Sequence, residues 1–405
     1  MRINPPLIAL AVGAFGIGVT EFAPMGMLPS IANDLGVSIP TAGLLVSAYA
    51  FGVLIAAPIV TLASAKAPRR VVLSGLMGVF TLGNLLAALS GSYRALLIAR
   101  VVTSLSHGAF FGIGSVVAAS VVPVEKRAGA VAAMFLGLTI ATIGGVPMAA
   151  WFGDTFGWRS AFWGIAGLGA IAVASLWLAL PTLPAPNRGA LTLELSVVTR
   201  TPVLAALALT VVGSSAMFTV FTYIAPILRG ATHASTPFVT GMLVLFGIGL
   251  TIGNVMGGKA ADRSLDRSLI VALAALVAVL LAFSISMRFP IAAAVSILVW
   301  GVASFAIVPP LQMRVMEAAK AAPNLASAVN IGAFNLGNAL GAALGGAVLR
   351  ADLGFPAVSL AGAAMALFGL ALVLAFQWRA NPARVSASSG NSAAVRGAML
   401  DRDRQ

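Results

Sequence analysis

The sequence predicts an all-α membrane protein whose twelve transmembrane helices form two pseudo-symmetric six-helix bundles. Apolar residues make up 60% of the 405-residue chain, which supplies at most about twelve spans at roughly 20 residues each. Charged residues make up only 9%, whereas a soluble protein carries about 25%. The lysines and arginines also gather in alternate loops. These three observations exclude an ordinary soluble enzyme.

Six apolar runs bounded by proline, glycine or charged residues fill the first half of the chain. The first run could be taken for a secretory signal, but it continues past Glu21 to Pro29 without an Ala-x-Ala cleavage site, so it is a retained span. The predicted spans are Pro6–Ser30, Thr41–Ala63, Arg70–Ser90, Arg94–Val121, Ala128–Ala150 and Ser160–Leu180.

The longest polar interruption lies between Pro181 and Thr201. It divides the chain into an N-terminal bundle (1–180), a cytoplasmic linker (181–201) and a C-terminal bundle (202–378). Residues 379–405 are rich in Ala, Ser, Gly, Asn and Arg and predict a disordered cytoplasmic tail. The six spans of the second bundle are Pro202–Pro226, Phe238–Ala260, Ser268–Met287, Phe289–Met313, Leu325–Leu349 and Phe355–Trp378.

The basic residues predict the orientation of the chain. Of the 24 lysines and arginines, 18 lie in loops and tails on the same side as the N-terminus, five lie on the other side, and Arg100 lies inside a span. Because cytoplasmic loops carry the excess of Lys and Arg, both termini are expected in the cytoplasm. The net charge of +13 therefore reflects topology, and no nucleic-acid partner is expected.

The composition leaves little room for metal or redox chemistry. The chain has no cysteine and only two histidines, which excludes disulfides and thiolate metal sites. No metal and no cofactor other than the proton gradient is expected.

Glycines and prolines within the spans predict close packing and bends. Two ladders of glycines at every fourth position favour close helix–helix contact in lipid: Gly249, Gly253 and Gly257, and Gly337, Gly341 and Gly345. Prolines that remove helix hydrogen bonds mark bends and possible gates at Pro24, Pro58, Pro147, Pro226, Pro309 and Pro310.

Two charged residues fall inside the predicted membrane core. Glu21 is the only acid placed there, because the other ten fall in predicted loops, the linker or the tail. Arg100 lies about 9 Å into its span and Glu21 about 14 Å into its own, both counted from the outer end. A charge in hydrocarbon costs several kcal/mol unless it faces a cavity or a partner. Both residues therefore predict function, the alternative being a structural pair that fixes the packing of two spans.

Polar residues continue this pattern on two helix faces. His107 titrates near neutral pH, which suits proton transfer, although a single buried histidine is often a hydrogen-bonded packing residue. The second face permits either substrate contact or interhelical hydrogen bonding. At about 100° per residue the faces collect Arg100, Thr103, Ser104, His107, Phe111 and Gly114 in one span, and Asn330, Phe334, Gly337, Asn338 and Gly341 in another.

Three segments carry a family likeness. The runs TEFAPMGMLPSIANDLGVS, RVVTSLSHGAFFGIGS and GLTIATIGGVPMAAWFGDTFGWRSAFW resemble the twelve-span drug:proton antiporter family of the major facilitator superfamily. The chain is most similar to the arabinose-efflux-permease-like branch, over essentially Pro6 to Trp378.

The resemblance implies roles for particular residues. Arg100 and Gly108 match a span-four motif whose arginine is implicated in proton transfer, and His107 stands where many relatives have Gln. Ala65 stands where the family's first loop motif has Asp. The other gating or conformational positions that match are Lys66, Arg69, Arg70, Gly137, Gly145, Pro147, Gly258, Asp262 and Arg263.

The resemblance implies a secondary active transporter in a bacterial inner membrane. It is expected to export small organic molecules of the drug, sugar or nucleoside class by proton antiport and alternating access, as a monomer in the bilayer. Glu21, Arg100 and His107 are expected to couple protons. The expected substrate cavity comprises Met25, Ser104, Phe111, Phe218, Tyr223, Trp300, Asn330 and Asn338.

The sequence leaves one alternative of the same class open and argues against an enzyme and a channel. A proton-coupled uptake symporter would use the same fold and the same residues. A membrane-embedded enzyme would need a nucleophile, a base and a metal site, and the sequence offers no such constellation. A channel would need polar faces on several spans, whereas only two are evident.

Overall fold

The computed structural model describes residues 4–64, 67–123, 127–181, 197, 199–319 and 323–380. These residues form helices joined by short loops, and no strand occurs among them. Twelve helical segments in the described chain are long and apolar enough to cross a membrane. The structure confirms the predicted fold class of an all-α, twelve-span membrane protein.

The first six spans lie within a few residues of their predicted bounds. The fifth is made of α5, a π-helical turn (η2) and α6. The helices are α1 (Pro5–Asp34), α2 (Ile39–Ala63), α3 (Arg69–Ala88), α4 (Tyr93–Ser120), α5 (Arg127–Ile140), η2 (Ala141–Gly145), α6 (Val146–Phe156) and α7 (Trp158–Ala179).

The last six spans also follow the prediction, although two of them are divided. The seventh span is followed by the short helix α10, and the tenth is made of α13 and α14. The helices are α9 (Thr201–Phe221), α10 (Ile224–Ala231), α11 (Thr236–Ala261), α12 (Leu265–Ser286), α13 (Pro290–Ala306), α14 (Val308–Ala318), α15 (Pro323–Arg350) and α16 (Gly354–Ala380).

Proline explains the three interruptions. Pro147 and Pro309 lie at the second position of a new helical segment, and Pro226 lies at the third. Proline lacks the N–H that would bond the preceding turn and clashes with its carbonyl, so the helix restarts there. Pro24 and Pro58 lie inside α1 and α2 without dividing them.

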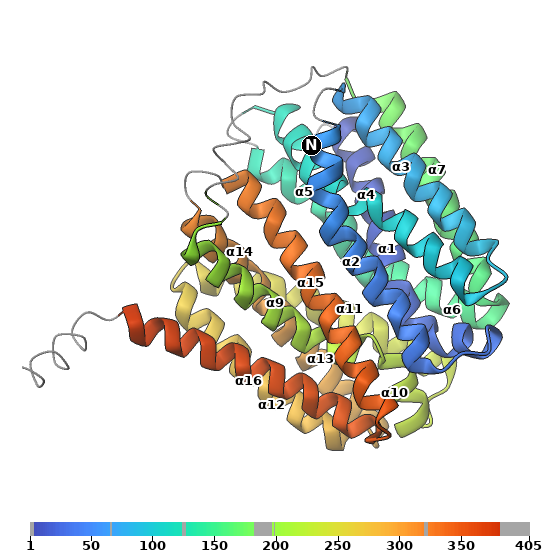
Figure 1. Ribbon diagram of the computed structural model, residues 1–405, viewed down its shortest axis with the longest axis vertical. Helices are drawn as coiled ribbons and strands as arrows, with labels where there is room; N and C mark the ends of the chain where they lie inside the picture. Colours follow the sequence, from blue (N-terminus) through green and yellow to red (C-terminus); the bar gives the residue numbers. More distant parts are fainter. Residues whose placement is uncertain are drawn as a thin grey trace, which may run out of the picture.

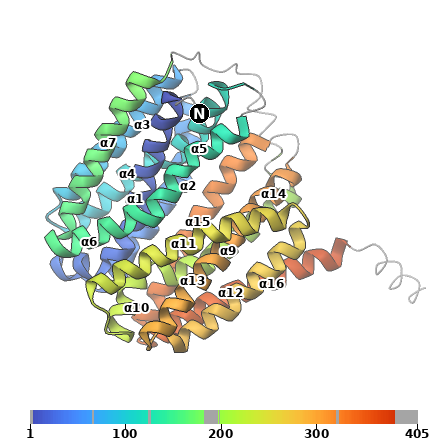
Figure 2. The same cartoon turned by 180° about the vertical axis from the view of Figure 1, so that it is seen from behind.

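The helices gather in two groups (Figures 1 and 2). One group contains α1 to α7, and the other contains α9 to α16. Helix α15 lies between α9 of its own group and α2 of the other (Figure 1). The α2–α15 contact is therefore the main seam between the groups.

Both glycine ladders contact a neighbouring helix, as predicted. A Cβ added at Gly249, Gly253 or Gly257 would collide with main-chain atoms of α13, and one added at Gly337, Gly341 or Gly345 would collide with α9. The missing side chains let these helix backbones approach closely.

An ion pair connects the two groups at one end of the molecule. We call the end at which α1 finishes and α6 ends the Asp154 end, and the opposite end, where α11 finishes, the Asp262 end. At the Asp154 end Arg229 of α10 forms an ion pair with Asp154 of α6, and Ser30 of α1 donates to the same carboxylate at 2.7 Å. The ion pair thus joins the two groups there, and Ser30 holds the same carboxylate within its own group.

This ion pair corrects part of the sequence interpretation. Asp154 and Arg229 were predicted to lie in loops, but each lies in a helix, and the Asp154 side chain is only 5% exposed. The helix is longer than predicted because α6 continues to Phe156, past the predicted end of the span. Glu21 is therefore not the only acid that is buried within a helix.

Some predictions fall outside the described residues. These are the position of Lys66, most of the predicted linker (182–196 and 198) and almost all of the predicted tail (381–405).

Candidate functional site

Glu21 lies near the middle of α1, the longest helix in the described part of the chain. Helix α1 runs without interruption from Pro5 to Asp34, so Glu21 is about 20 Å from its end at 1.5 Å per residue. This is deeper than the roughly 14 Å expected from the predicted end of the span, because α1 continues to Asp34. The residue is 4% exposed, so its carboxyl group is almost completely withdrawn from solvent.

His107 of α4 lies between Glu21 of α1 and Tyr49 of α2. Its Nε2 lies 4.0 Å from Glu21 Oε2, and its Nδ1 lies 3.0 Å from the hydroxyl of Tyr49. Glu21 comes from α1, Tyr49 from α2 and His107 from α4. The imidazole therefore lies between a carboxyl group and a phenol, with one ring nitrogen directed to each.

Arg100 lies two turns before His107 on α4. Its Nη1 donates to the main-chain oxygen of Thr20 at 2.8 Å and approaches the Thr20 hydroxyl at 3.3 Å. Its guanidinium lies 4.1 Å above the centre of the Tyr49 ring. Its Nε and Nη2 have no hydrogen-bond partner among the described residues. No Glu21–Arg100 pair within 4.0 Å occurs among the described residues, so the structural pair that the sequence left open as an alternative is not formed.

Three residues of this cluster were not identified from the sequence. Thr20 donates to Asn84 Oδ1 at 2.7 Å, and Asn84 donates to the main-chain oxygen of Phe80 at 2.8 Å. Tyr49, Thr20 and Asn84 are each at most 1% exposed. The available signal was the presence of polar side chains in apolar runs. It could have singled out Asn84 but not Tyr49, since an isolated tyrosine in a span is ordinary.

Aromatic side chains link the Glu21 region to the other group of helices. Phe22 stacks against Phe218 at 6.1 Å and meets the edge of Phe221 at 6.1 Å, both of α9. Phe221 stacks against Phe246 of α11 at 4.5 Å, and Phe246 lies 4.6 Å from Trp300 of α13. A continuous series of rings therefore begins at Phe22, the residue after Glu21, and crosses from the first group of helices to the second.

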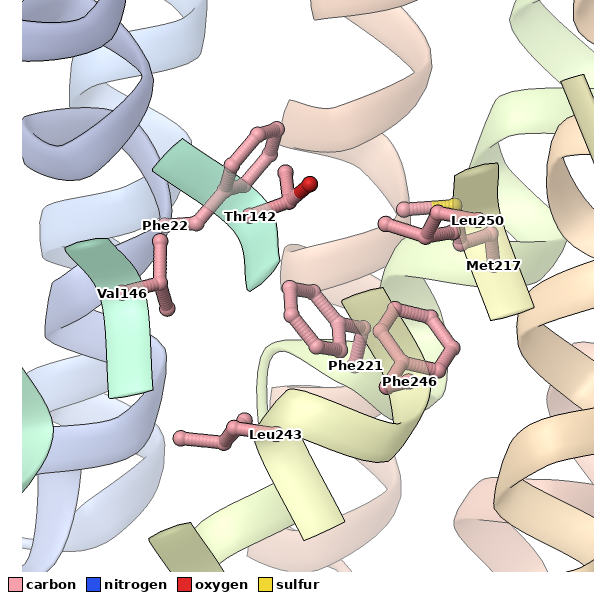
Figure 3. A pocket seen from close by; sticks show the side chains of 8 residues that line it. All are labelled: Phe22, Thr142, Val146, Met217, Phe221, Leu243, Phe246 and Leu250. Atoms are coloured by element: carbon pink, nitrogen blue, oxygen red, sulfur yellow. The ribbon is translucent and has the colours of Figure 1, made fainter. Parts of the chain in front are cut away.

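A small pocket lies beside these rings (Figure 3). It offers only about 10 Å³ of free volume, far below the usual size range for small-molecule sites. Thr142 is the one polar residue in its lining, and η2 presents this side chain to the pocket. The lining combines both groups of helices: Phe22, Thr142 and Val146 from one, and Met217, Phe221, Leu243, Phe246 and Leu250 from the other.

The predicted cavity residues of the first group are buried close to Glu21 and His107 or against neighbouring helices. Met25 is 0% exposed, one turn beyond Glu21 on α1. The ring of Phe111 lies 5.3 Å from that of His107 and stacks on Phe135 of α5 at 5.2 Å. The Ser104 hydroxyl donates to Val101 O at 2.6 Å.

Those of the second group are divided between helix contacts and unpaired polar groups. Asn330 accepts from Thr210 at 2.7 Å and donates to Gln312 at 2.6 Å, which is the interhelical bonding that the sequence left open. Tyr223 donates from α9–α10 to the Ala342 carbonyl of α15 at 2.9 Å. Phe218 contacts Phe334 edge-on at 5.5 Å.

Asn338 and Trp300 differ from these residues. Both are 0% exposed, and neither the Asn338 amide nor the Trp300 Nε1 has a hydrogen-bond partner among the described residues. Asn338 follows Gly337, which packs on α9, and precedes Ala339, whose carbonyl accepts from Ser47 of α2 at 3.1 Å. Asn338 therefore lies on the part of α15 that packs between the two groups of helices.

Most described residues of the predicted gating set make helix contacts. A Cβ added at Gly108 would meet Ala57 of α2, and one added at Gly137 or Gly145 would meet α1. Pro147 follows the π-helical turn. Arg70 lies over the Trp177 ring at 4.6 Å, and its neighbour Arg69 begins α3.

The remaining gating residues lie at the Asp262 end. Gly258 is in the last turn of α11, and Asp262 and Arg263 follow it. Asp262 and Arg263 line an open surface pocket of about 780 Å³ together with Asp266, Arg314 and Glu317. Among the described residues, no group of three or more His, Asp or Glu side chains could hold a metal ion.

A family model and two curated proteins match this chain over most of its length. Residues 10–332 match the family model of the Major Facilitator Superfamily. The chain is 57% identical over 376 residues to "Inner membrane transport protein YdhP" of Escherichia coli (strain K12), covering 93% of this chain and 96% of that protein. It is 30% identical over 374 residues to "Probable sugar efflux transporter" of Pasteurella multocida (strain Pm70), covering 92% of both.

A solved structure shares the fold. The crystal structure of a D-xylose-proton symporter matches with a TM-score of 0.77 at 15% identity, covering 92% of this chain and 97% of that chain.

Proposed function

The chain belongs to the major facilitator superfamily and is a membrane transporter of that family, and we propose that it exports small organic molecules in exchange for protons. It acts from a bacterial inner membrane with both termini in the cytoplasm. The similarity to a protein named as a sugar efflux transporter supports the direction and suggests polar substrates.

The observation that carries the proposal is the carboxyl group of Glu21, buried at the middle of α1 beside His107. Burying a carboxyl group in the membrane costs free energy, and such groups typically bind a proton or a substrate. Its nearest charged neighbour does not neutralise it in a close pair, because Thr20 and the Tyr49 ring hold Arg100. Glu21 is therefore free to gain and lose a proton.

Substrate and proton compete at this position. The substrate occupies the space between the groups, where rings from α1, α9 and α11 supply apolar surface. Asn338 and Trp300 supply hydrogen-bonding groups that have no partner in the described protein. An ionised Glu21 accepts a substrate donor, and a protonated Glu21 does not. This difference in binding between the two protonation states supplies the coupling free energy.

Rocking of the two groups changes access to the site. The Asp154–Arg229 pair closes the Asp154 end, and its rupture opens that end. A proton then enters from the periplasm through the Asp154 end and displaces the substrate. Release of that proton to the cytoplasm restores the site.

Purified protein in liposomes tests the proposal. Uptake of radiolabelled neutral sugars, nucleosides and phenicols is measured with the lumen made acidic, and again with the external medium made acidic. An antiporter concentrates its substrate when the lumen is acidic, because protons leaving the lumen drive substrate in.

Each result has a distinct meaning. Accumulation with an acidic lumen, abolished by a protonophore, supports antiport. Accumulation with an acidic exterior instead identifies an uptake symporter. Accumulation that ignores both gradients rejects proton coupling.

A further inference from the structure

Tyr49 lies between the two charged positions of the proton site. Tyr49 lies on α2 and is 1% exposed, and both its hydroxyl and its ring face make contacts in the site. Its hydroxyl contacts His107 Nδ1 at 3.0 Å, and its ring face lies 4.1 Å from the Arg100 guanidinium. One side chain thus holds both the imidazole beside Glu21 and the arginine.

We propose that Tyr49 is the positioning residue of the proton site: its hydroxyl stabilises the Nε2–H tautomer of His107 while Glu21 is ionised, and its ring keeps Arg100 from pairing with Glu21. The proposal deepens the proposed function and rests on it for the role of Glu21. It assigns Tyr49 no contact with substrate.

The tautomer follows from the hydrogen-bonding capacities of the three groups. A neutral imidazole has one N–H and one acceptor nitrogen, and an ionised carboxylate only accepts. With Glu21 ionised, Nε2 carries the proton and directs it at Glu21 Oε2, 4.0 Å away. Nδ1 then accepts from the Tyr49 hydroxyl. The ionised carboxylate therefore selects the Nε2–H tautomer, and the phenol stabilises it by acting as a donor, the stronger of its two hydrogen-bonding roles.

Protonation of Glu21 reverses this preference. The new O–H of Glu21 donates to Nε2, the imidazole proton moves to Nδ1, and Nδ1–H donates to the Tyr49 oxygen, which both donates and accepts. The site gains one proton in total, which resides on Glu21. The imidazole stays neutral and changes only which nitrogen carries its hydrogen.

Few other groups can affect His107. The titratable or charged groups around it in the described chain are Glu21 from α1, Tyr49 from α2 and Arg100 from its own helix. Helix α3 contributes the uncharged Asn84, which bonds Thr20, and α5 contributes Phe135 through Phe111.

Nitrogen NMR on [15N]histidine-labelled protein in lipid reads the tautomer directly. The chain has only two histidines, so a His233→Gln background leaves only the two ring nitrogens of His107. In alkaline buffer this protein is expected to contain mainly the Nε2–H tautomer.

Tyr49→Phe is the decisive variant, because it keeps the ring below Arg100 and removes the hydroxyl. We expect the Nε2–H to Nδ1–H ratio to fall about fivefold, the factor produced by loss of one typical hydrogen bond. The pH profile of transport should shift as well. Tyr93→Phe is the matched control, because it also removes one hydroxyl, which bonds Thr41 O at 2.7 Å instead. It should leave both readouts unchanged.

The outcomes separate this proposal from the proposed function. An unchanged tautomer ratio in Tyr49→Phe overturns the positioning role even if wild-type transport is proton-coupled. A ratio that changes in Tyr49→Phe but not in Tyr93→Phe supports the positioning role, even if the wild type does not couple protons. In that case only the antiport proposal fails.

Discussion

At the scale of single residues, sequence and structure agree on the charged positions and differ on their partners. Glu21, Arg100 and His107 stand out in the sequence because charge and imidazole are expensive in hydrocarbon. The contacts of Arg100 with Thr20 and with the Tyr49 ring depend on how three helices pack, which periodicity within one helix does not encode. For the same reason the ion pair of Asp154 could not be predicted, since its partner Arg229 lies 75 residues away in the sequence.

The shape of the guanidinium leads to a prediction for Arg100. Arg100→Lys keeps the charge, but an ammonium group cannot bond Thr20 and lie flat on the Tyr49 ring together. The loss of the ring contact alone is worth about 2 kcal/mol where it is desolvated. Proton-driven transport in liposomes should therefore fall at least about tenfold.

Arg94→Lys is the control, because Arg94 lies exposed near the start of the same helix. It should transport like the wild type. Equal activity of Arg100→Lys and Arg94→Lys would show that only the charge at position 100 matters.

At the scale of helices, the apolar runs were enough to predict twelve spans, but not their internal breaks. Prolines were recognised as bends, yet Pro24 and Pro58 leave their helices continuous while Pro147 follows a π-helical turn. Whether a proline divides a helix depends on what satisfies the freed carbonyl, and that is a property of neighbouring helices. Glycine ladders were more informative, because a missing side chain has a direct packing consequence.

Gly253 tests that packing. Gly253→Ala places a Cβ against Val302 of α13, where the colliding atoms belong to the main chain and cannot rotate away. Overpacking of this kind costs about 1–3 kcal/mol, so the melting temperature of the purified protein should fall clearly.

Gly241→Ala is the matched control on the same helix. An added Cβ there meets no atom within 4 Å, and alanine favours helix by up to about 1 kcal/mol over glycine. Its melting temperature should stay the same or rise. If both variants melted alike, the α11–α13 contact would not be as close as described.

At the scale of the whole molecule, an ion pair joins the two groups of helices at the Asp154 end. The composition and the basic loops predicted a membrane protein of two bundles, but the ion pair at the Asp154 end could not be read from them. The Asp154 side chain is 5% exposed and Arg229 30% exposed, so the pair lies between an exposed and a buried one in strength.

Asp154→Asn should therefore favour opening of the Asp154 end by about tenfold. The chain has no native cysteine, so spin labels on Asn33→Cys and Ser235→Cys report one distance across that end. Asp154→Asn should increase the population at the longer distance.

Asp34→Asn serves as its control. It removes the 2.6 Å ion pair of Asp34 with Arg159, which joins α1 to α7 within one group. The distance distribution should stay as in the wild type. An increase as large as that in Asp154→Asn would show that lost charge alone, and not the contact between groups, opens this end.

The central claim is that protons drive transport through Glu21, and Glu21→Gln in liposomes tests it most directly. The amide resembles the protonated carboxyl group but cannot release a proton. With an acidic lumen, the wild type should concentrate substrate, whereas Glu21→Gln should lose this accumulation and keep downhill passage of substrate with an unchanged melting temperature. If Glu21→Gln still concentrates substrate with the same pH dependence as the wild type, Glu21 does not carry the coupled proton.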